Sequence, residues 1–204
     1  MPSILTVIRA GLAALALTAI AQQLVLHIGA SYSALNFFSY FTNLSNLIAA
    51  SVLLLCVFKS NRGAMDLLRY VSVVNMAVVG LVFAVLLRDV DLGALLPWVN
   101  FVLHYVMPVA IVLDWLLNPP ALKLRSKSLL FAFVFPAIYL AYVVVRGAMI
   151  GWYPYPFLNP ANVGGYGGVA MYSLGITATF LLAACALLVV GNRLASARSR
   201  DAVR

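Results

Sequence analysis

The sequence predicts an all-α polytopic membrane protein with six transmembrane helices. Hydrophobic residues make up 65% of its 204 residues and charged residues only 9%, and its mean hydropathy is +1.05. These values lie far outside those of soluble domains. A bilayer core about 30 Å thick needs roughly 20 apolar residues per helix. Six windows meet this need, at about 5–27, 35–58, 68–87, 94–118, 129–146 and 168–191.

The connections between these windows are short, and the longest covers roughly residues 147–167. They leave no room for a soluble domain. In lipid, every backbone polar group must find its hydrogen bond within the protein. We therefore expect residues 1–204 to form a single six-helix transmembrane domain.

The distribution of positive charge predicts the orientation of the bundle. Of the thirteen Lys and Arg residues, only Arg88 and Arg146 fall on one side of the predicted topology, and the other eleven fall on the opposite side. By the positive-inside rule, both termini are cytoplasmic. Anionic headgroups at that face account for the basic balance, so no nucleic-acid partner is expected. The predicted location is a membrane, and we expect the inner membrane of a bacterium.

The first window also has an alternative interpretation. Arg9 precedes AGLAALALTAIA, in which Ala19 and Ala21 have the A-x-A arrangement of a signal-peptide cleavage site. The apolar run continues through LVLHIG, however, and cleavage would leave five helices. We therefore expect this segment to be the first membrane span.

A polar segment, FSYFTNLSN at residues 38–46, runs directly into the apolar LIAASVLLLCVF. Steps of three and four residues relate Ser39, Thr42, Ser45 and Asn46, so on one helix they would share a face. Each such residue taken singly more commonly joins helices by hydrogen bonds. Taken together, they equally predict a polar pocket in the outer half of the membrane.

The fourth window carries WVNFVLHYVMPVAIVLDW. Asn100 and His104 are four residues apart and share a helix face, and Pro108 can loosen the backbone and free a carbonyl. A lone histidine in an apolar helix is usually structural, yet imidazole is suited to proton exchange near neutral pH. Both polar helices run inward, and a rise of 1.5 Å per residue places Thr42 and His104 at similar depth. We hypothesise that they are neighbours.

The acidic residues have more ordinary interpretations. Asp114 lies about 15 Å further along its helix than His104, too far to orient the imidazole. We expect it to cap the helix or to form a salt bridge with a cytoplasmic Lys or Arg. Asp89 and Asp91 follow Arg88 and predict an exposed ion network.

No metal or other cofactor is expected. The chain has no glutamate, and its two histidines have no carboxylate or thiol at ligand spacing. Cys56 and Cys185 lie inside predicted helices, where a thiol usually acts as a small hydrophobic group. His27, near the outer end of the first window, is expected at the interface.

The order of FTNLSN, then NFVLHYVMPVAIVLDW, then GWYPYPFLNP resembles the androgen-induced family of multipass membrane hydrolases. It also resembles their bacterial relatives, described as predicted six-pass membrane proteins. The resemblance implies an intramembrane hydrolase that cleaves fatty acid esters of hydroxy fatty acids with a threonine nucleophile and a histidine. Thr42 and His104 match those two positions, and Pro108 and Asp114 follow the histidine as in the family.

The leading hypothesis is therefore an intramembrane lipid ester hydrolase in which His104 takes the proton of the attacking Thr42 hydroxyl. Four polar side chains are candidate oxyanion donors: Asn43, Ser45, Asn46 and Asn100. Candidates for binding a lipid carboxylate are Arg88 and Arg146. Trp152, Tyr153 and Tyr155 predict an outer aromatic belt, and the resemblance implies that Tyr155 also lines the pocket.

Two other functions are compatible with the same residues. One is a lipid-binding, fatty-acid-binding or transport protein that uses the pocket without turnover. The other is a structural bundle in which the polar stripe only joins helices. For the hydrolase and for the lipid-binding or transport protein, the expected partners are membrane lipids or fatty acid esters.

Overall fold

The structure, a computed structural model, describes residues 3–58, 62–90 and 95–201 and is helical throughout its regular elements. Within these residues, six helices are long and apolar enough to cross a membrane. The long helices are α1 (Ile4–Gly29), α3 (Phe41–Phe58), α4 (Arg62–Val82), α6 (Met107–Leu117), α7 (Ser128–Ile150) and α8 (Tyr166–Asp201). Shorter elements are α2 (Ala34–Phe37), α5 (Pro97–Phe101) and the turns η1 (Phe83–Leu87), η2 (Val102–Val106), η3 (Pro156–Leu158) and η4 (Pro160–Asn162).

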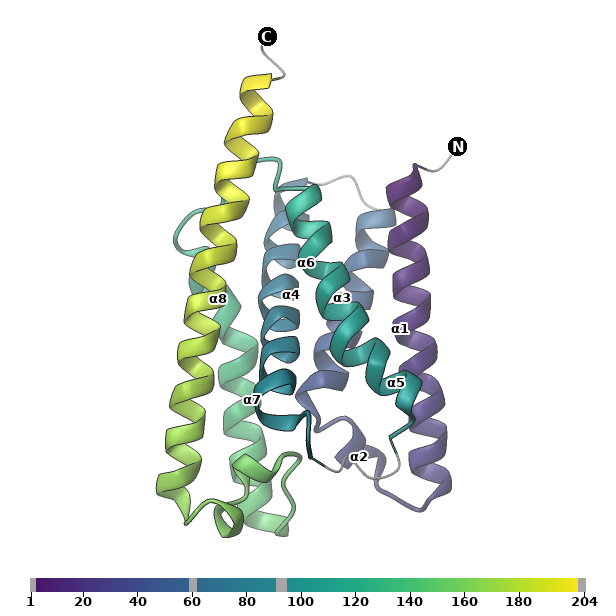
Figure 1. Cartoon of the computed structure of the whole chain (residues 1–204), viewed down its shortest axis with the longest axis vertical. Coiled ribbons are helices and arrows are strands. Elements are labelled where there is room, and N and C mark those ends of the chain that lie inside the picture. Colours follow the sequence, from purple (N-terminus) through teal and green to yellow (C-terminus); the bar gives the residue numbers. More distant parts are fainter. Residues whose placement is uncertain (1–2, 59–61, 91–94, 202–204) are drawn as a thin grey trace.

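The helices stand side by side in one bundle, with both termini at the same end (Figure 1). Helices α1 and α8 lie at opposite edges in this view, and α4 lies between them. Because α4 packs against α3, α6, α7 and α8, its span is the most buried of the six. We call the end that carries the termini the inner end and the opposite end the outer end, after the predicted orientation.

The second span begins later than predicted. The expected helix from residue 35 is wrong at its start, because α2 is a single turn and α3 begins only at Phe41. Ser39 lies in the turn between them: its hydroxyl donates to Leu35 O (2.7 Å) and its backbone N–H to Asn36 O (3.0 Å). These local bonds compete with continuation of the helix. Ser39 is therefore not on the helical stripe, and Thr42 is the second residue of α3.

Two spans contain a π-helical turn, η1 after α4 and η2 between α5 and α6. The turn η2 ends directly before Met107 and Pro108, and proline has no N–H with which to continue the α-helical ladder. The backbone loosening predicted at Pro108 is therefore present. On α4, a Cβ atom at Gly80 would lie 3.1 Å from Pro108 Cβ, so the missing side chain lets the two helices approach closely.

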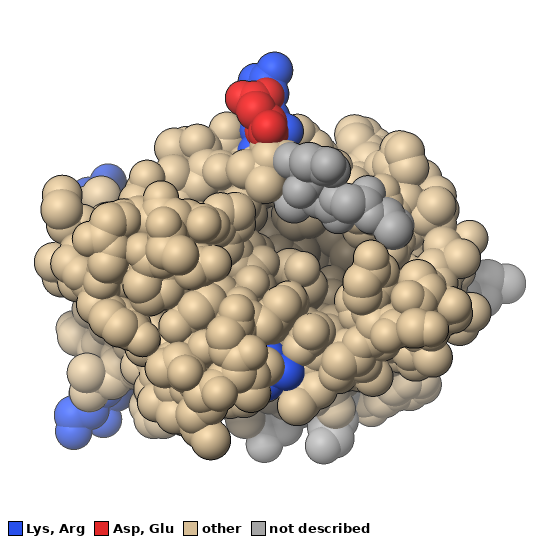
Figure 2. Space-filling model, turned by 90° about the horizontal axis from the view of Figure 1, so that it is seen from below, with Lys and Arg blue, Asp and Glu red and all other residues tan. Residues whose placement is uncertain are grey.

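The outer end carries few charged side chains. Figure 2 shows this end of the molecule, and its surface is hollowed near the centre. The segment between α7 and α8 folds over the bundle here and buries Tyr155, Phe157 and Leu158. Gly147 makes room for this fold, because a Cβ atom there would collide with the ring of Tyr153.

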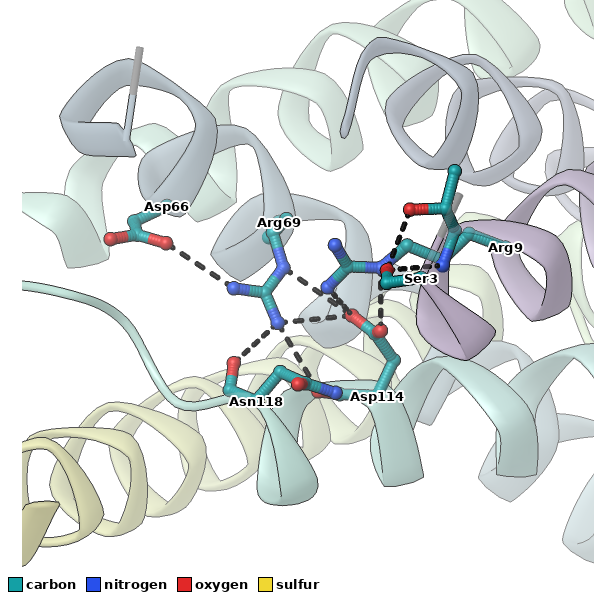
Figure 3. A network of polar contacts seen from close by, with 7 residues as sticks. Ser3, Arg9, Asp66, Arg69, Asp114 and Asn118 are labelled. Atoms are coloured by element: carbon teal, nitrogen blue, oxygen red, sulfur yellow. Dashed lines mark hydrogen bonds and ion pairs between the residues drawn. The ribbon is translucent and has the colours of Figure 1, made fainter. Parts of the chain in front are cut away.

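Two arginines and two aspartates form a network near the inner end (Figure 3). Asp114 on α6 bridges Arg9 on α1 (2.8 Å) and Arg69 on α4 (3.0 Å). Arg69 also pairs with Asp66 (3.2 Å), which accepts the Ala121 N–H (2.7 Å). The salt bridge predicted for Asp114 is confirmed. The network is mostly buried, and its charges balance.

The described charged residues that follow α4 and the two cysteines lie outside this network. Arg88 and Asp89 are exposed at the end of η1, while Asp91, the third member of the predicted ion network, lies outside the described residues. Cys56 and Cys185 are both free, half-buried thiols.

Candidate functional site

The structure brings Thr42 and His104 together near the outer end of the bundle. Thr42 Oγ1 lies 3.2 Å from His104 Nε2, and the two residues are 7% and 8% exposed. They come from different spans: Thr42 from the first turn of α3, and His104 from η2. A hydroxyl and an imidazole at this distance form the pair that nucleophilic catalysis requires.

The imidazole is held in the orientation that turns a lone pair toward Thr42. Its Nδ1 lies 3.2 Å from the Asn100 carbonyl oxygen, which can only accept a hydrogen bond. We therefore assign the proton to Nδ1, which leaves Nε2 as an acceptor for the Thr42 hydroxyl. The ring of Phe83 stacks on the imidazole, with centroids 4.1 Å apart. The sequence did not reveal Phe83 as a neighbour of the imidazole, because nothing distinguishes it from other apolar residues of its helix.

Tyr155 reaches the same hydroxyl from the outer segment between α7 and α8. Its hydroxyl oxygen accepts the backbone N–H of Thr42 (3.2 Å) and lies 3.4 Å from Thr42 Oγ1. This N–H belongs to the first turn of α3, where backbone donors lack partners within the helix. The Tyr155 ring packs between Tyr40 (5.7 Å) and Phe157 (5.2 Å). Burial raises the pKa of Tyr155 to about 12, so its O–H remains available as a donor.

The amides beside Thr42 are used to join elements. Asn43 Nδ2 donates to Phe37 O (2.9 Å) and thereby ties α2 to α3. Asn46 Nδ2 donates to Thr42 O (2.9 Å) and, across to η2, to Leu103 O (3.2 Å). Because Asn46 engages both of its amide hydrogens in this way, its geometry favours the helix-joining interpretation.

Several buried polar atoms extend the polar region inward from Thr42. Within the described residues, the side-chain oxygens of Ser45, Asn46 and Asn100 have no hydrogen-bond partner, and neither do those of Ser72 and Asn75 on α4. Helices α3 and α4 are packed antiparallel, so Asn46 and Asn75 lie at similar depth, roughly 18–20 Å from the inner ends of their helices. Ser72 and Asn75 were not among the predicted site residues, although their spacing of three residues places them on one helix face.

An apolar cavity adjoins the hydroxyl of Thr42. Its volume is about 90 Å³, and residues of α3, α4, α7, α8 and the outer segment form its wall. Thr42 and Tyr155 lie in its wall, and the rest is largely hydrocarbon or aromatic, including Phe41, Val78, Leu140, Phe157, Ile176 and Phe180. This apolar lining suits the part of an alkyl chain that lies beside Thr42.

The two outer arginines do not line this cavity. Arg88 is exposed. Arg146 donates to Asn36 Oδ1 (2.6 Å), and its guanidinium lies 5.3 Å from the ring centre of Trp152. Arg146 thus ties α7 to α2, and Trp152 is half-buried against it. His27 is half-buried, with Nε2 3.0 Å from Ser33 O.

A model of a known protein family matches most of the chain. The family model for FAR-17a/AIG1-like protein matches residues 30–189, which include α3, η2, the outer segment and most of α8. No curated protein and no solved structure matches the chain. The matched region covers most of the chain and contains Thr42, His104 and Tyr155. The chain is therefore a member of the FAR-17a/AIG1-like family.

Proposed function

We propose that this protein is a membrane-embedded hydrolase of lipid carboxylic esters, with fatty acid esters of hydroxy fatty acids as the first substrates to test. Its proposed setting is the inner membrane of a bacterium. The observation that carries the proposal is the 3.2 Å approach of Thr42 Oγ1 to His104 Nε2, with Thr42 in the wall of an apolar cavity. Membership of the family supports it.

In the first half of the reaction, Thr42 Oγ1 bonds to the ester carbonyl carbon while His104 Nε2 takes the hydroxyl proton. The acyl chain lies in the cavity. The intermediate then collapses and the bond to the alkoxy oxygen breaks. His104 returns the proton to that oxygen, so the alcohol leaves and an acyl ester of Thr42 remains.

The negative charge that develops on the carbonyl oxygen needs fixed donors. The O–H of Tyr155 is the nearest side-chain donor, because its oxygen lies 3.4 Å from Thr42 Oγ1. That oxygen accepts the Thr42 N–H, which polarises the phenol and strengthens it as a donor. The positive end of the α3 dipole acts in the same direction.

In the second half, water attacks the acyl carbon and gives a proton to His104. The bond from the acyl carbon to Thr42 Oγ1 breaks, and His104 returns the proton to that oxygen. The products are a carboxylic acid and the free hydroxyl of Thr42. Over both halves, one ester and one water give one acid and one alcohol.

The test is turnover of a long-chain ester by purified protein in lipid nanodiscs, with mass spectrometry of released acid and of an acyl group on the peptide that contains Thr42. Thr42→Ala should lower the rate by about 10³-fold or more, whereas Thr42→Ser should keep part of it. Thr18→Ala, at an exposed position on α1, is the matched control and should retain wild-type turnover.

The outcomes separate the proposal from its rival. Wild-type turnover by Thr42→Ala would remove the nucleophile. Saturable binding of the ester without hydrolysis or acylation would leave a lipid-binding or transport protein that uses the same cavity.

A further inference from the structure

A second apolar hollow lies on the side of the bundle, between the outer ends of α4 and α8. This groove has a volume of about 710 Å³ and is open to the surroundings on one side. Its walls come from the end of α4, from η1 and from the first turns of α8. They are almost entirely apolar and include Leu81, Val85, Leu86, Met171, Gly175 and Ile176.

The groove shares a wall with the cavity beside Thr42. Val82 and Ile176 line both hollows, so these two side chains separate the groove from the cavity. Both are half-buried. Rotamer changes of such side chains occur on the picosecond to nanosecond timescale when they are not tightly packed. A movement of these two side chains would join the two hollows into one channel.

The position and chemistry of the groove define what can occupy it. Its walls belong largely to membrane-spanning segments, so the medium outside is the hydrocarbon of the bilayer. Thr179, one of its few polar residues, donates its hydroxyl to Gly175 O (3.0 Å) and so offers no free donor. The matching occupant is therefore an alkyl chain, and the groove lies in the outer half of the membrane.

We propose that the groove between α4 and α8 is the lateral route by which a bilayer-dissolved ester reaches Thr42, with an alkyl chain passing between Val82 and Ile176. This inference rests on the proposed function. The competing route is from the aqueous side, through the hollow at the outer end (Figure 2). A lateral route makes the substrate a lipid taken directly from the membrane, whereas an outer route would suit a soluble ester.

The test compares a long-chain ester dissolved in nanodisc lipid with p-nitrophenyl acetate, which is water-soluble and has no long chain. Gly175→Trp fills the groove, and the backbone accepts it because a Cβ atom at Gly175 would meet nothing within 4 Å. Leu174→Trp is the matched control. Leu174 is the preceding residue at nearly the same depth, is 70% exposed and lines neither hollow.

Gly175→Trp should lower kcat/KM for the long-chain ester by about tenfold or more and leave that for p-nitrophenyl acetate within about twofold of wild type. Leu174→Trp should change neither value. Unchanged hydrolysis of the long-chain ester by Gly175→Trp, or an equal loss for both esters, would overturn the lateral route while leaving the hydrolase intact. If wild-type protein hydrolyses neither ester, the proposed function itself fails.

Discussion

The hydroxyl oxygen of Thr42 lies 3.2 Å from Nε2 of His104, although 62 positions separate the two residues in the chain. Two parts of the fold produce this contact, and a third adds to it. The turn at Ser39 places Thr42 at the free N-terminal end of α3, the π turn η2 carries the imidazole, and the outer segment adds the hydroxyl of Tyr155. The pair is therefore a property of the packed bundle.

His104→Ala should abolish most of the hydrolysis while leaving the folded yield unchanged. Loss of the base is expected to lower kcat by about 10²- to 10⁴-fold, because the Thr42 hydroxyl is a weak nucleophile while it keeps its proton. His27→Ala provides the control, since His27 is the other histidine and lies away from Thr42. The measurement is kcat in nanodiscs together with the elution profile on size exclusion. Wild-type kcat in His104→Ala would show that another group takes the proton.

Tyr155→Phe should lower kcat by about 10²-fold or more, the usual effect of losing one oxyanion donor. The ring and its packing on Tyr40 and Phe157 are retained, so KM should change little. Tyr32→Phe removes a hydroxyl from an exposed tyrosine at the outer end and should have no effect. A raised KM with unchanged kcat would assign Tyr155 to substrate binding alone.

The buried phenol of Tyr155 also predicts how stability depends on alkaline pH. The pKa of Tyr155 is raised to about 12 in the folded protein, above its ordinary value near 10. The folded state thus holds the proton more tightly than the unfolded state, so this contribution to stability is complete below about pH 10 and is lost as the pH rises toward 12. Thermal unfolding in detergent should be less sensitive to pH in this window for Tyr155→Phe than for wild type. Equal slopes would indicate that the phenol ionises as readily when folded.

Asp114→Asn should destabilise the protein without slowing the chemistry. It leaves the guanidinium groups of Arg9 and Arg69 mostly buried and short of one negative charge, and loss of one partner from a buried pair costs up to about 3–5 kcal/mol. Asp89→Asn, on an exposed carboxylate, should change the unfolding free energy by no more than about 0.5 kcal/mol. Thermal unfolding measures both. Equal effects of the two variants would show that the inner network contributes nothing specific.

Local composition was sufficient to predict the six spans and the common end of the two termini. The transfer of about 20 apolar residues into lipid is a local property of each window. The distribution of Lys and Arg between the connecting segments, which predicts the orientation, is also visible in the sequence alone. The ion pair of Asp114 followed from its depth and from the basic residues at the same end. Thr42 and His104 were selected by polar periodicity and by resemblance to a family, and matched depth suggested that they could meet.

Other features depended on how the helices pack. The predicted span from residue 35 did not reveal the turn at Ser39. Hydropathy does not distinguish one apolar helix from two helices joined by a local hydrogen-bonded turn. Phe83 against the imidazole, Asp66 in the inner network, and Ser72 and Asn75 beneath Thr42 all depend on the rotation of α4 about its axis. The groove beside Ile176 depends on how α4 and α8 separate toward the outer end. The sequence by itself determined which segments enter the membrane and which polar residues enter with them, because transfer from water to lipid acts on each segment separately. Only the tertiary structure decided which side chains meet and where a cavity remains, because these depend on the packing of segments far apart in the chain.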